Sequence, residues 1–335
     1  MSARPRAVFP VEILELIFSD LDIEDFPSII AANHQFNCIA SRCLYRCIPE
    51  MKPRRTIGCM KTLEANKDIA TLVRTLRINY GVHRPIGNFF RLLHRVLVKT
   101  TSLRHFSIEL SQHDNHYTRT AWLFQGCRFS LRSLTTSMIC DTTLARFLET
   151  QHEIFELCLR GFQTTSHFDI SPSALPALTT FRAVHVGAPI LTEIITGRPV
   201  EAVSLSLFPE DGFTPLDALR HSRTPIKRLT VMSLEFSGPE QLIAEVSSRL
   251  PQLEALHIVI LALSYSNQIL LNSSQHLRRF PELRYLTVMA PGSTTTQDEE
   301  KIASSWHKAC PTLKTIILPK GKVWFERDGK WTCWD

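Results

Sequence analysis

A short apolar pattern, L-x-x-L-x-L with other apolar residues allowed at the L positions, recurs ten times along the chain. Its copies lie on average about 27 residues apart, a near-regular spacing that chance matches in a leucine-rich chain would not give. Two copies lack a large apolar residue at the last position, where Thr136 and Ala183 stand instead. The copies begin at Val73, Leu103, Leu131, Ile154, Leu178, Val200, Ile226, Leu253, Leu283 and Leu313. The 335 residues are therefore expected to form a repeat array rather than a set of separate globular domains.

The segments between the copies have the pattern of helices. Residues 88–99 carry apolar side chains at helical spacing, and Asp141 is placed to cap a helix over 142–150. Prolines mark both ends of such helices, because proline suits a first helical turn and also stops a helix before an extended segment. The first kind is Pro189, Pro215 and Pro239, and the second kind is Pro176, Pro251, Pro281 and Pro311. Each repeat is predicted to be a helix, a proline stop and a short strand.

A repeat of this kind predicts an α/β solenoid. The first, fourth and sixth residues of the pattern point inward and stack on their equivalents in neighbouring repeats, which builds a core that one repeat could not build alone. Over roughly residues 60 to 320 the pattern resembles the leucine-rich-repeat family. The Asn or Cys that this family carries after the strand is largely missing, since Ser111, Phe162 and Pro291 stand there and only Cys140 is near it. We therefore expect an irregular leucine-rich-repeat horseshoe without a regular ladder of side-chain amides.

Residues 8–48 form a separate unit ahead of the repeats. Pro10 can open a helix with acids on one side, Asp25 precedes a second helix, and Asn33 starts a third helix through Ile48. The apolar face of the first helix consists of Ile13, Leu14, Ile17, Phe18 and Leu21. Three short helices in about 40 residues make a marginal core, so a partner or the adjoining repeats must cover the remaining apolar surface.

The same unit resembles the F-box family. The residues that carry the resemblance are Phe9-Pro10, Glu12-Ile13-Leu14, Ile17-Phe18, Leu21, Asp25-Phe26, Phe36, Ile39-Ala40 and Leu44-Tyr45. The chain departs from the family pattern at Pro27 and over residues 31–34. The resemblance implies a short three-helix domain that docks the Skp-type adaptor of a cullin ubiquitin ligase. Adaptor binding is then expected at Pro10, Ile13, Leu14, Ile17, Phe18, Leu21 and Phe26.

The end of the chain has the pattern of a hairpin. Residues 323–334 alternate aromatic and other side chains around Asp328-Gly329. A two-residue turn between alternating runs favours a β-hairpin, because a primed turn needs positive φ at both central residues. We expect this hairpin to cap the array, since terminal repeats need a cover over their exposed core. The alternative is that Trp324, Trp331 and Trp334 stack on a ligand.

Charge is unevenly distributed along the chain. Residues 12–25 contain six acids and no Lys or Arg, whereas residues 69–140 contain ten basic and two acidic side chains. A basic stretch of this kind can attract acidic peptide, phosphate or nucleic acid. It lacks interleaved aromatic residues and any DNA- or RNA-binding motif, so nucleic-acid or phosphoinositide binding is the weaker alternative. A merely solvated surface is the other alternative.

Catalytic and cofactor motifs do not occur in the sequence. There is no Gly-rich nucleotide loop, no H-E-x-x-H, G-x-S-x-G or C-x-x-C, and no apolar run long enough for a transmembrane helix. His34, Cys38, Cys43 and Cys47 suggest a metal site, but on one helix the last two fall on the side opposite to His34. We therefore expect no enzyme activity, no metal or other cofactor, and no membrane partner. Nine cysteines without disulfide-framework spacing favour reduced thiols in the cytoplasm, the nucleus or both.

The strands also predict where a target would bind. The third, fifth and seventh positions of each copy point away from the core, because strand side chains alternate. These positions predict substrate contacts at Arg77, His105, Arg160, Arg182, Arg228, His257 and Tyr285. The cationic end suits a carboxylate or phosphate, whereas the last copies also present Val259, Met289 and Ile317 and suit an apolar anchor. The alternative is that the arginines pair with local acids such as Glu109 and Glu156.

Together these features predict an F-box helical domain over 1–50, a leucine-rich-repeat-like solenoid over 51–320 and a capping hairpin over 321–335. The combination is similar to the degenerate F-box receptors that mushroom-forming fungi carry in large numbers. It implies the substrate-recognition subunit of a Skp–cullin–F-box ubiquitin ligase. The F-box would hold the adaptor and cullin, and the repeats would bind a target protein with acidic or phosphorylated groups. An F-box scaffold that acts without a ligase is the remaining alternative.

Overall fold

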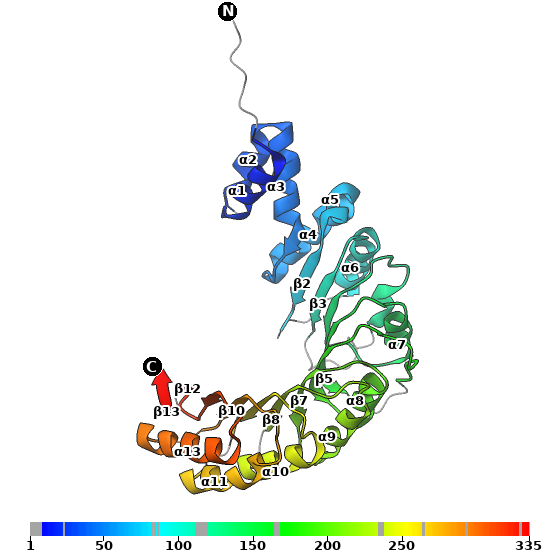
Figure 1. Cartoon of the computed structure of the whole chain (residues 1–335). Coiled ribbons are helices and arrows are strands. Elements are labelled where there is room, and N and C mark those ends of the chain that lie inside the picture. The colour runs from blue at the N-terminus through cyan, green and yellow to red at the C-terminus, as the bar shows by residue number, and fades with distance from the viewer. Residues whose placement is uncertain are drawn as a thin grey trace, which may run out of the picture. The chain divides into compact units, whose positions relative to one another are not determined.

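The computed structural model describes residues 9–22, 24–81, 83, 85, 87–110, 120–163, 168–233, 238–262, 265–291, 294–327 and 330–334. The chain divides into two compact units, residues 1–134 and 135–335. In both units helices and strands alternate along the chain, so each is a mixed α/β structure (Figure 1). The division falls inside the predicted solenoid.

The first unit begins with three helices, as the sequence predicts: α1 (Val11–Ser19), α2 (Phe26–Ala32) and α3 (His34–Arg46). The elements that follow are β1 (Cys47–Ile48), α4 (Pro53–Ala65), α5 (Lys67–Leu72), β2 (Thr75–Asn79), α6 (Gly87–Lys99), β3 (His105–Glu109) and the 3-10 helix η1 (Ala121–Phe124). Strand β4 (Ser133–Thr136) lies across the division between the units.

The second unit continues the alternation with shorter helices. Its elements are α7 (Thr142–Glu149), β5 (Glu156–Gln163), β6 (Thr180–Val186), α8 (Ala188–Ile195), β7 (Ala202–Leu207), α9 (Thr214–Ala218), the 3-10 helix η2 (Leu219–His221), β8 (Arg228–Ser233), α10 (Pro239–Arg249), β9 (Ala255–Ile260), α11 (Asn267–Asn272), α12 (Ser274–Leu277), β10 (Tyr285–Met289), α13 (Thr296–Ala309), β11 (Thr315–Ile317), β12 (Val323–Arg327) and β13 (Lys330–Trp334). All ten copies of the apolar pattern, in the two units together, contribute a strand, β2 to β11.

Strands that are neighbours in the sheet are also neighbours in the chain. The order is β1-β2-β3 in the first unit and β5 to β13 in the second, where the sheet is open and parallel up to β11. The register sets the fourth pattern positions of the second unit side by side, in the buried row Leu157, Phe181, Val203, Leu229, Leu256, Leu286 and Ile316. This confirms the predicted inward stacking. Thr136 and Ala183, the two exceptions to the pattern, are buried as well.

A backbone regularity fixes the start of most of the parallel strands. The carbonyl oxygen of Lys227, just before β8, accepts bonds from Glu254 N at 2.8 Å and Ala255 N at 3.0 Å. The Glu254 carbonyl in turn accepts bonds from Arg284 N at 2.8 Å and Tyr285 N at 3.1 Å. The same pair of bonds is formed by the carbonyl groups of Arg74, Arg104, Thr179, Glu201 and Arg284. Equivalent positions of successive repeats are therefore locked to one another through the main chain.

Several helices begin where the sequence predicts. The Asp141 side chain caps α7 by accepting bonds from Thr143 N at 3.0 Å and Leu144 N at 2.9 Å. Pro189, Pro215 and Pro239 lie in the first turns of α8, α9 and α10. Asn33 caps α3 through Phe36 N, but Asp25 precedes α2 without a side-chain capping bond.

The predicted third helix through Ile48 is too long. Helix α3 ends at Arg46, because Cys47 and Ile48 are extended and pair in parallel with Thr75 and Leu76 of β2. Strand β1 therefore adds to the sheet ahead of the first copy of the pattern. At the other end, β12 and β13 form the predicted antiparallel hairpin, and its turn, Asp328-Gly329, lies outside the described residues.

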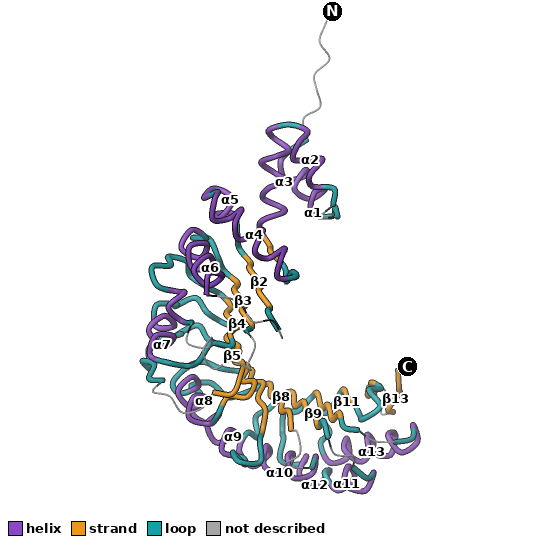
Figure 2. The backbone as a smooth tube through the Cα atoms, turned by 180° about the vertical axis from the view of Figure 1, so that it is seen from behind, coloured by secondary structure: helices purple, strands orange, loops and turns teal. Residues whose placement is uncertain are grey.

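The second unit has two layers. Helices α8 to α13 lie along one side of strands β7 to β11, and the view from behind shows the same arrangement (Figures 1 and 2). The inward row of the sheet packs toward these helices. The opposite face of the strands carries half-buried and exposed side chains, including Arg182, Thr230, Tyr285 and Met289. This uncovered face is where a ligand can reach the sheet.

Candidate functional site

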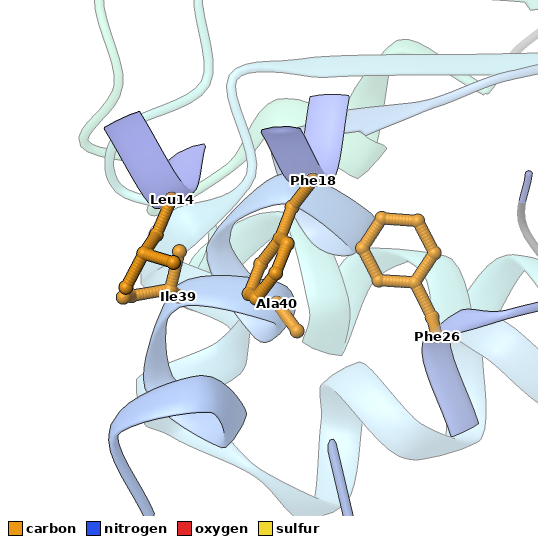
Figure 3. Close-up of a cluster of buried hydrophobic side chains, with 5 residues drawn as sticks. All are labelled: Leu14, Phe18, Phe26, Ile39 and Ala40. Atoms are coloured by element: carbon orange, nitrogen blue, oxygen red, sulfur yellow. The ribbon is translucent and has the colours of Figure 1, made fainter. Parts of the chain in front are cut away.

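Helix α1 has one face that packs inside the first unit. Leu14 and Phe18, one turn apart, point with Phe26 of α2 toward Ile39 and Ala40 of α3 (Figure 3). All five side chains are buried. Phe36 joins this cluster through an edge-on ring contact with Phe18, at a centroid distance of 5.5 Å. These residues hold the three helices together.

The structure therefore corrects part of the predicted adaptor-binding set. Leu14, Phe18 and Phe26 belong to the core of the unit and are not available as a contact surface, because their side chains are covered by α3 and by one another. Leu21 is half-buried against the same cluster. Pro10, Ile13 and Ile17 are exposed and remain candidates for contact.

A second set of apolar side chains, on α1 and just before it, is exposed, and sequence reasoning found this set only in part. Besides Ile13 and Ile17 it includes Phe9, Val11 and Leu16, and Leu16 is 63% exposed. We call these five residues the α1 face. The signal was present in the sequence, because nearly every non-acidic position from 9 to 18 is apolar. Apolar type alone did not show which of these residues faced α3.

Acidic side chains border the α1 face. Glu12, Asp20 and Asp22 are exposed, and Glu15 is half-buried where it pairs with Arg42 of α3 at 3.0 Å. A helix that is apolar toward its own domain and also toward solvent has more apolar surface than a three-helix unit can cover. The α1 face therefore has the character of a docking surface with an acidic border.

Four cations of the basic stretch form contacts within the first unit. Arg74 donates to Ser102 O at 3.2 Å, and Arg104 donates to Ser130 O at 2.9 Å. Arg95 pairs with Glu64 at 3.2 Å, and Lys99 donates to the Glu64 carbonyl. These cations join the turns and helices of successive repeats.

The seven predicted substrate-binding residues all lie on strands, and all of them are exposed or half-buried. Arg77 and His105 belong to the first unit, where His105 Nδ1 and Ser133 Oγ form a hydrogen bond of 2.9 Å. The other five are Arg160, Arg182, Arg228, His257 and Tyr285 in the second unit. Half-buried Arg160 is level with Val184 on β6.

A hollow of about 500 Å³ lies on the uncovered face of the second unit and brings three of these residues together. Its lining includes Glu156, Arg182, Ser204, Arg228, Thr230 and His257, and we call it the cationic hollow. The hollow exists because the outward positions of β7 carry only the small side chains Ala202 and Ser204 between the longer residues of β6 and β8.

The two arginines of the cationic hollow differ in their partners. Arg182 pairs with Glu156 at 3.1 Å, so the alternative of pairing with a local acid is confirmed for this residue. Arg228 is exposed and forms no salt bridge with any residue that the structure describes. With two arginines and one carboxylate, the hollow carries about one net positive charge and can compensate one anionic group.

His257 lines one side of the cationic hollow and is hydrogen-bonded and half-buried there. Its Nδ1 and Thr287 Oγ1, on the next strand, form a hydrogen bond of 2.9 Å. Burial lowers the pKa of His257 below its ordinary value, since the imidazolium loses hydration there. The neutral ring is therefore favoured when the hollow is empty, and an anion beside it would favour the charged ring.

Large apolar side chains gather on the same face at the C-terminal end of the second unit. Tyr285, Met289, Phe325 and Trp334 are all exposed, and Trp334 is 78% exposed. The register explains their common side: Tyr285 is level with Thr315, which is level with Phe325, and Ile317 is level with Val323, which is level with Trp334. We call the four exposed residues the apolar patch. Phe325 was missed in the sequence, although strict alternation with Trp324 could have indicated it.

The three tail tryptophans have different environments. Trp324 is buried and its Nε1 donates to Glu299 Oε2 at 3.2 Å. Trp331 packs against His307 of α13 at a ring distance of 5.5 Å. Two of the three are thus used inside the fold, and Trp334 alone of the three has the exposure that a stacking contact with a ligand needs.

Metal ligands, cysteines and apolar helices are the remaining features of the described residues that bear on function. No group of three or more His, Cys, Asp or Glu side chains there could hold a metal ion, and His34 Nδ1 lies 3.9 Å from Cys38 Sγ without further ligands. None of the nine cysteines forms a disulfide, and burial raises the pKa of Cys127 to about 12. Within the described residues, none of the helices has the length and apolar character needed to cross a membrane.

Two comparisons with known proteins were made for the sequence. No protein-family model matches the chain, and a search of curated proteins finds no match.

Proposed function

We propose that this chain is the substrate-recognition subunit of a Skp–cullin–F-box ubiquitin ligase, with α1 to α3 as a three-helix F-box and the repeats as an irregular leucine-rich-repeat horseshoe capped by the β12–β13 hairpin. In this proposal the α1 face docks the Skp-type adaptor, which links the chain to the cullin. The uncovered sheet face holds a target protein. Ubiquitin transfer is catalysed by other subunits, and the free thiols suit the cytoplasm or the nucleus.

The observation that carries the proposal is the exposure of the α1 face. Phe9, Leu16 and Ile17 are 59%, 63% and 45% exposed on a unit whose core is small. Burying one such side chain against a partner contributes about 1.5–3 kcal/mol, so a partner that covers the face gains several such contributions. Phe9, Ile13 and Ile17 of this face, and the core residues beneath it, belong to the set that resembles the F-box pattern.

The acidic border indicates the kind of partner surface that fits. A partner groove that is apolar in its centre and basic at its rim would complement both the exposed side chains and the carboxylates of Glu12, Asp20 and Asp22. Rim charges of this type mainly accelerate association, while the apolar centre supplies the affinity.

The test is capture of a purified Skp-type adaptor by the full chain. The double variant Ile13→Gln, Ile17→Gln removes exposed apolar area without touching the core, and glutamine keeps a good helix propensity. Capture should weaken at least about tenfold, because two apolar side chains no longer leave water on binding. The matched control is Val98→Gln, which changes an exposed apolar residue of α6 and should leave capture unchanged.

Two results would decide against the proposal. Undiminished adaptor capture by the double variant, at an unchanged melting temperature, would show that the α1 face is not the docking surface. Failure of the wild-type chain to capture any Skp-type adaptor would remove the ligase assignment itself. Capture of the adaptor without co-purification of a cullin would instead indicate a scaffold that acts without a ligase.

A further inference from the structure

The cationic hollow and the apolar patch lie on one face of one unit, in a fixed order. The hollow spans β5 to β9, and the apolar patch spans β10 to β13. A single row of outward positions connects them, because the register sets Ser204 level with Thr230, Thr230 level with His257, and His257 level with Thr287. The row continues through Ile317 and Val323 to Trp334. The neighbouring outward row runs from Arg228 through Ala255, Tyr285 and Thr315 to Phe325. A ligand that crosses the strands along these rows meets first a cationic and then an apolar surface.

We propose that the two surfaces together bind one extended peptide segment, with an anionic side chain in the cationic hollow and an apolar or aromatic side chain on the apolar patch. This deepens the proposed function by naming the class of target segment, and it rests on the target binding to the sheet. The anion is a carboxylate or a phosphorylated side chain. A peptide fits better than a nucleic acid, because about one net positive charge opposes a single anionic group and not a row of phosphates.

The spacing of the strands gives the spacing of the two groups in the peptide. Adjacent strands lie about 4.8 Å apart, so Tyr285 on β10 lies about 14 Å from the centre of the hollow on β7, and Phe325 on β12 lies about 24 Å from it. An extended chain covers about 3.3–3.6 Å per residue. The anionic and the apolar residues should therefore be separated by about four to seven positions.

The pairing of Arg182 with Glu156 decides between the two kinds of anion. With His257 neutral, one carboxylate balances the free charge of Arg228, whereas a dianionic phosphate leaves an excess negative charge. A phosphopeptide is therefore expected to bind well only when His257 becomes protonated. A glutamate peptide carries no such requirement, so its affinity should increase less on acidification than that of the phosphopeptide.

The probes are fluorescein-labelled synthetic peptides built on a Gly-Ser background, measured by fluorescence anisotropy with the full chain. One series carries a single glutamate and a single phenylalanine with separations of about two, five and twelve residues. Matched peptides contain only one of the two groups, and another replaces glutamate with phosphoserine. The separation of about five should bind best, at least about tenfold tighter than either single-group peptide, since the second contact becomes intramolecular.

Four variants locate the binding. Arg228→Ser should weaken the best peptide about tenfold by removing the anion contact, whereas the exposed Arg278→Ser on the helical side should not. Ser204→Phe fills the floor of the hollow and should weaken binding of the best peptide to a similar extent. Tyr285→Ser should lower the affinity for the two-group peptide to that of the glutamate-only peptide. Adaptor capture and the melting temperature should remain unchanged in all four, because none of these residues lies in the first unit or in the core.

Several results would overturn the inference. Peptides that bind equally at every separation, or that bind Arg228→Ser and Ser204→Phe as tightly as the wild type, would show that the two surfaces do not act together. Absence of any binding by the whole series would do the same. Tighter binding of a single-stranded RNA oligomer than of the peptides, lost in Arg228→Ser, would assign the hollow to nucleic acid. If the adaptor is still captured when the peptides fail, only the peptide inference is wrong and the proposed function stands. If the peptides bind but the adaptor is not captured, the proposed function is wrong and the peptide inference stands.

Discussion

The indole Nε1 of Trp324 donates a hydrogen bond of 3.2 Å to Oε2 of Glu299. The two residues are 25 positions apart, one on the terminal hairpin and the other on α13, and both are buried. Glu299 Oε1 also accepts bonds from Thr294 Oγ1 at 2.7 Å and from Lys320 N at 3.2 Å. One carboxylate thus joins the helix, the chain after β11 and the hairpin, which is how the cap is fixed to the last repeat.

Removing the tryptophan should loosen this junction. Trp324→Ala is expected to cost about 3–5 kcal/mol, because a large buried side chain is lost, and Trp324→Phe should cost about 1–3 kcal/mol, because the carboxylate loses a buried donor. Each kcal/mol corresponds to a fall in Tm of about 2–4 °C in a unit of this size. The control is Trp334→Phe on the same hairpin, which is exposed and should not change the Tm. Equal melting of all three variants would contradict this role for Trp324.

Deletion of residues 323–335 tests the whole cap. In the intact chain the inward side chain of Ile316 is level with Trp324 of β12. Without β12, this side chain and the edge of β11 should become exposed. We expect a lower melting temperature, binding of a hydrophobic dye and association of the chains at raised concentration. The control keeps the hairpin and changes its outward residues, Phe325→Ser with Trp334→Ser, which should leave melting unaltered. A truncated chain that stays monomeric and melts like the wild type would show that the hairpin is not a cap.

A buried arginine, Arg198, joins the end of α8 to the segment that contains Ser171 and Ala174 in the second unit. Arg198 is 1% exposed and donates to the carbonyl oxygens of Ser171 at 2.8 Å, Ala174 at 2.8 Å and Ile194 at 3.0 Å. Burial lowers the pKa of Arg198 below its ordinary value, although the carbonyl groups keep the guanidinium solvated by protein dipoles. Arg198→Met should cost at least about 2 kcal/mol, since buried acceptors lose their donors. Urea unfolding measures the loss, and exposed Arg223→Met is the control that should show none.

The helical unit offers a test that separates its core from its docking surface. Leu14→Ala with Phe18→Ala should cost about 4 kcal/mol or more and unfold α1 to α3, because both side chains are in the core. Ile13→Gln with Ile17→Gln should leave the helical circular dichroism and the melting of the unit intact. The two double variants would both lose the adaptor, for different reasons. An unchanged fold in the first pair would contradict the placement of Leu14 and Phe18 in the core.

The sequence predicted the strands well and the surfaces less well, for a physical reason. Inward positions repeat with a fixed period, so all ten strands of the pattern could be placed, and strand alternation then indicated Arg182, Arg228 and His257 on the other face. Strand β1 has only two residues and no pattern of its own. On α1, apolar side chains lie on the covered and on the exposed parts of the helix, so the choice between the core and the α1 face depended on where α3 packs. Arg198 was not identified at all, because its partners are carbonyl groups, which no side-chain motif marks.

The pH dependence of the second unit should have opposite signs for stability and for binding. Burial lowers the pKa of His257 in the free chain, so the unfolded chain takes up the proton at a higher pH than the folded chain does. The stability that the neutral ring contributes is therefore present above the ordinary histidine pKa of about 6.5 and is lost as the pH falls through the lower folded value. The pKa of His185 is also lowered by burial, so part of this loss persists in any variant of His257 alone.

An anion in the cationic hollow should reverse this trend at His257. The charged and titratable groups that line the hollow with it are Arg182, Arg228 and Glu156, and a bound carboxylate adds a negative charge that favours the imidazolium. Affinity for the glutamate–phenylalanine peptide should therefore increase as the pH is lowered from about 7.5 to about 5.5, a range in which a glutamate of pKa about 4.3 stays ionised. His257→Asn can keep a polar contact with Thr287 but cannot take up the proton, so its binding should not vary over this range. A variant with the wild-type pH profile would show that another group takes up the proton, and a wild-type affinity that falls at low pH would exclude an anion beside His257.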